Sequence, residues 1–115
     1  MISVRVSPLD KRLAHLRFGS VHMHAALGEG GITVFKREGD GATPVGAMAI
    51  LSGFRNGRLR ISAPCPLDLV RTGNRHGWCD ASTHASYNQP VRLPFSASHE
   101  QLLRDDCLYD FALVL

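Results

Sequence analysis

The sequence lacks the segments that mark a membrane-spanning or secreted chain. No apolar run within its 115 residues approaches the roughly 18 to 20 residues that a membrane helix needs. The N-terminal stretch, Met-Ile-Ser-Val-Arg-Val-Ser-Pro, does not join a charged region to a long apolar core, so we expect no signal peptide. The sequence therefore predicts no membrane span and leaves the localisation open between the cytoplasm and export by a leader removed beforehand.

The motifs of the common metal and nucleotide sites are also missing. Cys65, Cys79 and Cys107 contain no Cys-x-x-Cys pair, which argues against a compact zinc site and for reduced thiols. No Gly-Lys-Ser or Gly-Lys-Thr closes a glycine-rich loop, so a phosphate loop is excluded. Without aromatic residues interleaved among the arginines, a nucleic-acid surface is disfavoured. We expect no cofactor, no metal and no nucleic-acid partner.

The bulk composition is that of one globular domain covering residues 1–115, with a modest core. Hydrophobic residues make up 44% of the chain and charged residues 20%. The net charge of +3 makes the chain mildly basic, which permits acidic ligands.

Alternating apolar and polar residues predict a mainly β fold. Residues 2–7, 13–18 and 20–27 are expected to form three short antiparallel strands separated by tight turns. Asn56-Gly57 lies between residues 47–55 and 58–62 and predicts a two-residue hairpin.

The C-terminal half combines an irregular region, a short helix and a last strand. Residues 63–97 contain four prolines and predict a long connection without regular structure, of the kind that carries function or acts as a lid. Ser98 as N-cap, with Gln101 completing a capping box, predicts one short helix near 98–105. Residues 108–115 predict an apolar strand.

Two groups of residues that contain histidine are candidates for chemistry. His76, Cys79 and Asp80 lie close in sequence, so Cys79 is a candidate nucleophile with a nearby base; the simpler interpretation is a buried thiol beside loop hydrogen bonds. His22 and His24 lie on one strand face and are potential metal ligands, but no third ligand is evident, and two exposed histidines are the simpler interpretation.

Five arginines surround the predicted hairpin and the region after it. They are suited to binding carboxylates or phosphates through charge-assisted hydrogen bonds, or they form an ordinary solvated face. These residues are Arg55, Arg58, Arg60, Arg71 and Arg75.

Residues 36–46, Lys-Arg-Glu-Gly-Asp-Gly-Ala-Thr-Pro-Val-Gly, form the most informative segment. Three glycines and a proline between two apolar segments predict a loop that holds one shape at the surface. That loop either serves a binding site or is only a rigid connection between strands.

The same segment resembles the Gly-x-x-x-Thr-Pro-x-Gly motif of L,D-transpeptidase catalytic domains, the YkuD-like family. Residues 78–80 (Trp-Cys-Asp), 87–94 (Tyr-Asn-Gln-Pro-Val-Arg-Leu-Pro) and 98–110 resemble a bacterial subgroup of that family. The resemblance extends from about residue 2 to the last residue.

The resemblance implies a twisted β-sandwich with a cleft and peptidoglycan stem peptides as ligands. Family members join stem peptides through a cysteine acyl-enzyme, in the cell envelope. The matching positions that would bind substrate are Thr43, Pro44, Gly46, Trp78, Tyr87 and Asn88.

The family's catalytic segments have no counterpart in this sequence. Neither its histidine segment nor its Gly-Cys segment is matched, and no cysteine follows a glycine, so the nucleophile is assigned to none of the three. We therefore expect the N-terminal portion of such a domain, inactive by itself, with residues 108–115 free to pair with another copy.

Two alternatives stay open beside the transpeptidase-like domain. One is a non-catalytic β module that binds acidic peptide or cell-wall ligands through its arginines. The other is a cytoplasmic relative that acts on a different amide.

Overall fold

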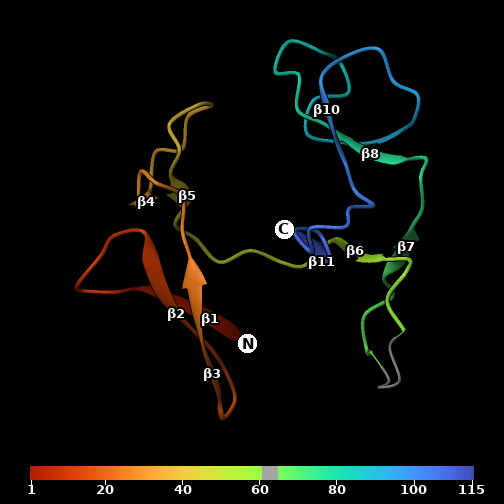
Figure 1. Cartoon of the computed structure of the whole chain (residues 1–115). Coiled ribbons are helices and arrows are strands. Elements are labelled where there is room, and N and C mark those ends of the chain that lie inside the picture. Colours follow the sequence, from red (N-terminus) through yellow and green to blue (C-terminus); the bar gives the residue numbers. More distant parts are fainter. Residues whose placement is uncertain (61–64) are drawn as a thin grey trace. The chain divides into compact units, whose positions relative to one another are not determined.

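The computed structural model describes residues 1–60 and 65–115, and these residues form short strands joined by turns (Figure 1). The strands are β1 (Ile2–Val6), β2 (Leu13–Phe18), β3 (Val21–Ala26), β4 (Ile32–Thr33), β5 (Thr43–Pro44), β6 (Ser52–Asn56), β7 (Val70–Thr72), β8 (His76–Cys79), β9 (Pro90–Arg92), β10 (His99–Gln101) and β11 (Phe111–Val114). The predicted mainly β fold is thus confirmed. The chain divides into two compact units, Met1–Ala47 and Met48–Leu115, which we call unit 1 and unit 2.

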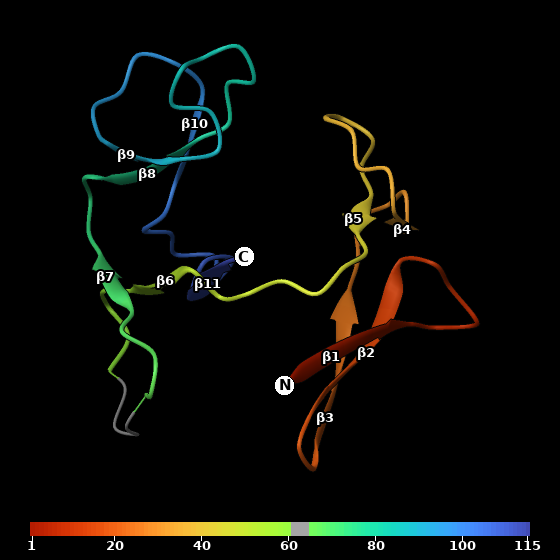
Figure 2. The same ribbon diagram turned by 180° about the vertical axis from the view of Figure 1, so that it is seen from behind.

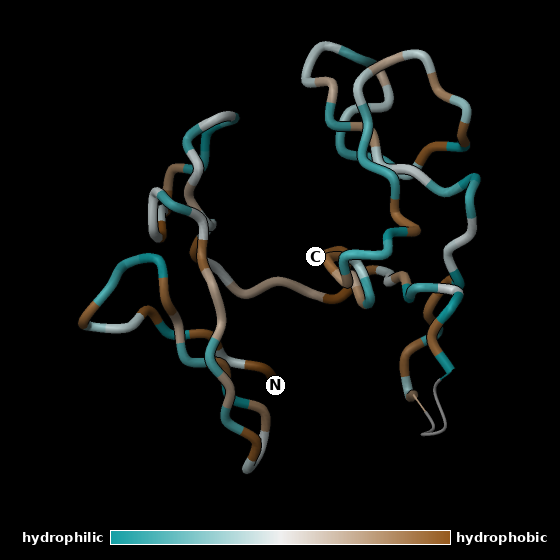
Figure 3. Tube along the Cα trace, in the orientation of Figure 1, coloured by the Kyte–Doolittle hydropathy of each residue, from teal (hydrophilic) through white to brown (hydrophobic). Residues whose placement is uncertain are grey.

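Unit 1 begins with an antiparallel meander of β1, β2 and β3, in that order across the sheet. The three strands predicted from residues 2–7, 13–18 and 20–27 are confirmed with small changes at their ends. The same alternation of apolar and polar positions along this part of the chain is visible in Figure 3.

The register of the meander separates two faces. Val4, Leu16 and Met23 lie side by side on one face, and Arg5, His15 and His24 lie side by side on the other. This follows from the period of two in a strand, which sends neighbouring side chains to opposite faces. The predicted separation of the β3 histidines from its apolar residues is therefore confirmed.

The glycine-rich loop of unit 1 is held between two short parallel strands, β4 and β5. Backbone N–H groups of Gly30, Thr43 and Val45 donate hydrogen bonds of 2.8 to 2.9 Å to carbonyls of residues 41, 31 and 33. Gly39 and Gly41 have φ angles of 75° and 62°, which explains why glycine occupies both positions.

Unit 2 contains two three-stranded sheets, ordered β11-β6-β7 and β10-β8-β9 (Figure 2). The β6–β7 pair is parallel, and the other pairs are antiparallel. Among the described residues of this unit, the buried hydrophobic ones are Phe54, Cys79, Leu102 and Leu103. Leu102 and Leu103 directly follow β10 and are buried outside any helix or strand.

The predicted helix near 98–105 is wrong, because no helix occurs in residues 1–60 or 65–115. Residues 99–101 instead form β10, in which His99 pairs with Cys79 and Gln101 with Gly77. The N–H of Leu102 then donates to the carbonyl of His76, 3.0 Å away. Pairing with β8 thus uses the backbone groups that a helix would have needed.

The predicted hairpin at Asn56-Gly57 is also wrong. Both edges of β6 are occupied, by β7 and β11, and residues 58–60 form no strand. Residues 61 and 62 of that predicted strand lie outside the described residues. Neither Asn56 nor Gly57 has the positive φ that the predicted turn demands.

The region 63–97, predicted to lack regular structure, contains β7, β8 and β9. Strands of three or four residues are too short to show a period in sequence. Pro90 is the first residue of its strand, a position where the missing N–H is tolerated.

The last predicted strand, 108–115, is present in shortened form as β11. It lies at the edge of its sheet and pairs with β6 alone. No helix in the described part of the chain has the length and apolar character needed to cross a membrane.

Candidate functional site

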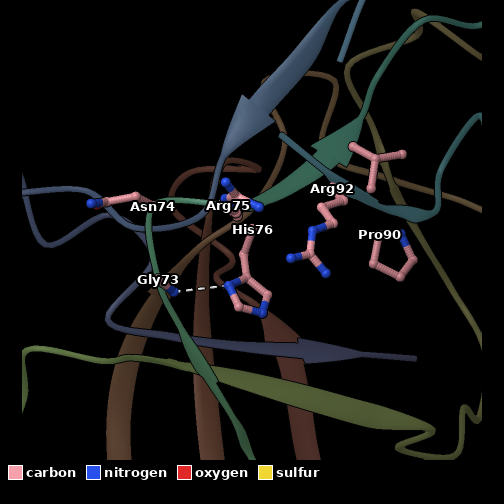
Figure 4. A pocket seen from close by; sticks show the side chains of 7 residues that line it. Gly73, Asn74, Arg75, His76, Pro90 and Arg92 are labelled. Atoms are coloured by element: carbon pink, nitrogen blue, oxygen red, sulfur yellow. Dashed lines mark hydrogen bonds between the residues drawn. The ribbon is translucent and has the colours of Figure 1, made fainter. Parts of the chain in front are cut away.

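A hollow of about 490 Å³ in unit 2 lies beside the start of β8 and along β9 (Figure 4). We call it the His76 cleft. Its lining residues are Gly73, Asn74, Arg75, His76, Pro90, Val91 and Arg92. They come from the turn before β8, the first residue of β8, and the whole of β9.

The imidazole of His76 is fixed by the turn that precedes it. Its Nδ1 accepts a hydrogen bond of 2.9 Å from the backbone N–H of Gly73 (Figure 4). The N–H of His76 in turn donates to the carbonyl of Gly73, 3.0 Å away. Because Nδ1 accepts, the neutral ring carries its proton on Nε2, which is free to donate to a ligand.

Arg92 lies directly opposite His76 in the β8–β9 pair. Opposed residues of an antiparallel pair project to the same side, and Figure 4 shows the Arg92 guanidinium and the His76 ring extending into one space. Arg75 adds a second exposed guanidinium to the lining. Neither arginine forms an ion pair with a carboxylate among residues 1–60 and 65–115.

A second hollow of about 560 Å³ adjoins the first and shares Gly73, Asn74 and His76 with it. Its arginines, Arg58 and Arg71, are partly engaged. Arg58 pairs with Asp105, and Nη2 of Arg71 donates to the carbonyl of Gly57 at 2.7 Å. Among the described residues that line the two hollows, none is acidic.

The structure does not assemble the candidate nucleophile with a base. His76 and Cys79 are three positions apart in β8, so their side chains point to opposite faces of the strand. Cys79 is 1% exposed, whereas Asp80 is exposed just beyond the strand. The arrangement corresponds to the simpler interpretation of Cys79 as a core residue.

Trp78 and Asn88, expected at a substrate site, do meet. The indole Nε1–H donates to Oδ1 of Asn88 at 3.2 Å, and the Asn88 N–H donates to the carbonyl of Cys79 at 2.9 Å. The N–H of the neighbouring Tyr87 donates to the carbonyl of His84, also at 2.9 Å. Asn88 has a φ of 56°, a conformation that asparagine tolerates better than most residues.

Thr43, Pro44 and Gly46 belong to unit 1, in the glycine-rich loop and its exit. Oγ1 of Thr43 accepts a hydrogen bond from the N–H of Gly28 at 2.9 Å, so this hydroxyl has a structural partner. Pro44 pairs with Thr33 in the β4–β5 ladder, and a Cβ added at Gly46 would meet open space.

Asp40 organises the same loop through its carboxylate. It accepts from Lys36 and from the backbone N–H groups of Arg37 and Ala42, the latter two at 2.7 and 2.9 Å. The hydrogen bond from Lys36, followed by those from the two amides, lowers the pKa of Asp40 to about 2.

Arg92 is the site residue that no sequence pattern indicated. It lies in residues 87–94, a segment that was singled out only for its family resemblance. Its partner His76 precedes that segment in the chain. Only the register of β8 and β9 brings the two together.

Comparison of the chain with protein-family models, curated proteins and solved structures gives no match. The resemblance to L,D-transpeptidases therefore depends on the quoted sequence motifs alone. No group of three or more potential metal-binding side chains occurs among the described residues.

Proposed function

We propose that unit 2 is a small binding module that takes the carboxylate of an acidic peptide into the His76 cleft. The observation that carries the proposal is the composition of the lining. His76 and Arg92 face the same space from opposed strand positions, Arg75 stands beside them, and no acidic side chain is present among the described lining residues.

The available hydrogen-bond donors suit a carboxylate. A guanidinium binds a carboxylate through two parallel N–H groups, and such charge-assisted hydrogen bonds are about twice as strong as neutral ones. The Nε2–H of His76, oriented by the Gly73 amide, supplies a further donor. Pro90 and Val91 form an apolar wall for the aliphatic part of a peptide.

Cell-wall stem peptides are the ligand class that we propose. They carry free carboxylates on small aliphatic residues, which fits a cleft with two guanidinium groups and an apolar wall. The resemblance of the quoted motifs to peptidoglycan-acting domains supports the same choice.

The test is binding of the chain to an acidic stem peptide and to isolated sacculi. We expect Arg92→Gln to weaken binding about tenfold, which corresponds to one charge-assisted hydrogen bond. Raising the salt concentration should weaken binding further, because the guanidinium groups are exposed.

Arg37→Gln is the matched control, since it removes the same charge from an exposed residue of unit 1. It should leave the affinity within about twofold. An equal loss in both variants would reduce the effect to net charge, and an affinity unchanged by Arg92→Gln would exclude the cleft. Amidating the peptide's carboxylates should abolish the difference between Arg92→Gln and the unmodified chain.

An L,D-transpeptidase-like domain that lacks its catalytic segments is the second candidate. The backbone and carboxylate hydrogen bonds within residues 36–46 favour it, because this segment carries the family motif and is predicted to hold one shape at the surface. On this proposal the purified chain gives no thiol-dependent cross-linking of stem peptides.

Alkylation of the native chain tests the role of Cys79 in that candidate. Cys65 and Cys107 are exposed and should react first, and Cys79 only on unfolding. Rapid alkylation of Cys79 together with peptide cross-linking would show instead that this thiol is the nucleophile.

A further inference from the structure

The polar face of the unit 1 meander brings two histidines into contact across neighbouring strands. His15 of β2 and His24 of β3 are directly opposed, and their ring centroids lie 5.3 Å apart with the planes tilted by 56°. We propose that His15 and His24 together bind a late first-row divalent metal ion such as Ni²⁺ or Cu²⁺. This site is independent of the His76 cleft and of the peptide binding proposed for it.

The pairing differs from the one that the sequence suggests. His22 and His24 share a face of β3, but they are separated along the strand, and His22 lies opposite Arg17. Opposed residues approach to about 4.5 to 5.5 Å between Cβ atoms, whereas diagonal or next-but-one neighbours are farther apart. His15 is therefore the residue that can share an ion with His24.

Both rings have nitrogen atoms to offer. The three histidines of unit 2 each use Nδ1 in a contact with the backbone: His76 with Gly73, His84 with Ser86, and His99 with Ala97. In contrast, the rings of His15 and His24 make no hydrogen bond to any residue in the described ranges 1–60 and 65–115. Both are exposed, so an ion can reach them from solvent.

The number of ligands determines which ions fit. Two imidazoles, with water in the remaining positions, do not make the closed four-ligand site of structural zinc. They suit ions for which imidazole is a favoured ligand, and affinity for a given set of ligands rises from Co²⁺ through Ni²⁺ to Cu²⁺. Mg²⁺, which prefers oxygen ligands, should not bind.

The charges around the pair make a distinctive prediction. Arg5 of β1 lies opposite His15, on the side of β2 away from β3. Arg17 occupies the next position of β2 on the same face and lies opposite His22. These cations repel a divalent ion. Removing Arg5 should therefore tighten metal binding, by about threefold for a screened interaction at the surface, whereas it would weaken the binding of an anion.

The experiment is calorimetric titration of the full chain with Ni²⁺, in a background where exposed Cys65 and Cys107 are replaced by serine. His15→Ala and His24→Ala should each lower the affinity about a hundredfold, because the second imidazole binds at high effective concentration. His22→Ala is the matched control and should change the affinity by less than about threefold. Co²⁺ should bind more weakly than Ni²⁺.

Paramagnetic broadening by Ni²⁺ gives a second readout that needs no histidine substitution. Amide signals of β2 and β3 nearest to residues 15 and 24 should be lost first. Broadening centred on another part of the chain, an equal effect of His22→Ala, or weaker binding by Arg5→Gln would each overturn the proposal.

Discussion

Unit 1 and unit 2 maintain their structures in different ways. The meander of unit 1 has strands of five or six residues paired along their length, and Ala14 is its buried hydrophobic residue. Among its described residues, unit 2 has strands of three to five residues but buries four hydrophobic side chains together with Asn56 and Thr72. Backbone hydrogen bonds between strands, and a loop held by the Asp40 carboxylate, thus maintain the first unit. A small core with buried polar side chains maintains the second.

The two units are therefore sensitive to different kinds of substitution. In unit 1, a substitution that displaces the backbone should lower the free energy of unfolding most, because few side chains are buried there. In unit 2, the loss of one buried polar side chain should be enough to lower the free energy of unfolding, because that side chain joins segments far apart in sequence. Glycine and asparagine substitutions and one pH titration distinguish these two kinds of dependence.

The largest effect is expected from Gly28→Ala in unit 1. The new Cβ would fall on the carbonyl oxygen of Gly41 and close to the backbone of Ala42, neither of which can move without displacing the loop. We expect a loss of about 3 kcal/mol in the free energy of unfolding. Urea denaturation followed by far-ultraviolet circular dichroism measures it.

Gly46→Ala is the control for this prediction. No atom lies within 4 Å of its added Cβ, and its φ is not in the left-handed region. We expect a change within about 0.5 kcal/mol. Equal effects at the two glycines would contradict the close approach of residues 28 and 41.

A smaller effect is expected from Asn56→Ala in unit 2. Nδ2 of Asn56 donates to the carbonyl of Arg104 at 3.1 Å and to Oδ1 of Asp110 at 3.0 Å, and its Oδ1 accepts from the N–H of Arg58 at 3.0 Å. Leaving these groups unpaired should cost about 2 kcal/mol. The same denaturation experiment measures it.

Asn74→Ala provides the comparison, since Asn74 is exposed. It should alter the free energy of unfolding by less than about 0.5 kcal/mol. If Asn56→Ala were as mild, the connection of β6 to residues 104–110 would contribute little, and the contrast between the units would fail.

The smallest effect is expected at acidic pH in the loop of unit 1. The pKa of Asp40 is lowered from 3.8 to about 2, so its contribution to stability is complete above pH 3.8 and disappears as the pH falls through about 2. We expect the amides of Arg37 and Ala42 to lose their carboxylate partner in that window. A carbon-13 NMR titration of the Asp40 carboxyl group measures the midpoint.

Asp40→Asn should remove this transition and leave the amide signals of the meander unchanged. A midpoint near 3.8 would show that Lys36 and the two amides do not hold the carboxylate in solution.

Sequence patterns predicted the structure well where one side-chain period extends over five or more residues. The strands of the meander, the separation of Met23 from His24 on opposite faces, and the last strand all follow from alternation. The patterns were misleading where tertiary pairing outweighed a local signal. Ser98 and Gln101 form a good capping box, but β8 pairs with residues 99–101 as a strand.

The candidate site could be predicted only in part. His76 stood out in sequence, but its three-residue spacing from Cys79 separates the two once β8 is extended. The approach of Arg92 depends on the register between β8 and β9, which no local pattern encodes. The same holds for Asn56. It is predicted as a turn residue, but its buried side chain donates a hydrogen bond to the carbonyl of Arg104.

The position of Trp78 has a practical consequence for spectroscopy. It is the single tryptophan of the chain, and its ring meets that of Phe54 edge to face at 6.3 Å, with the indole N–H bound to Asn88. Both tyrosines, Tyr87 and Tyr109, also belong to unit 2. Intrinsic tryptophan and tyrosine fluorescence therefore reports on unit 2 and not on unit 1. A melting curve recorded from this emission will follow the unfolding of the unit that contains the cleft, and it will not detect unfolding of the meander.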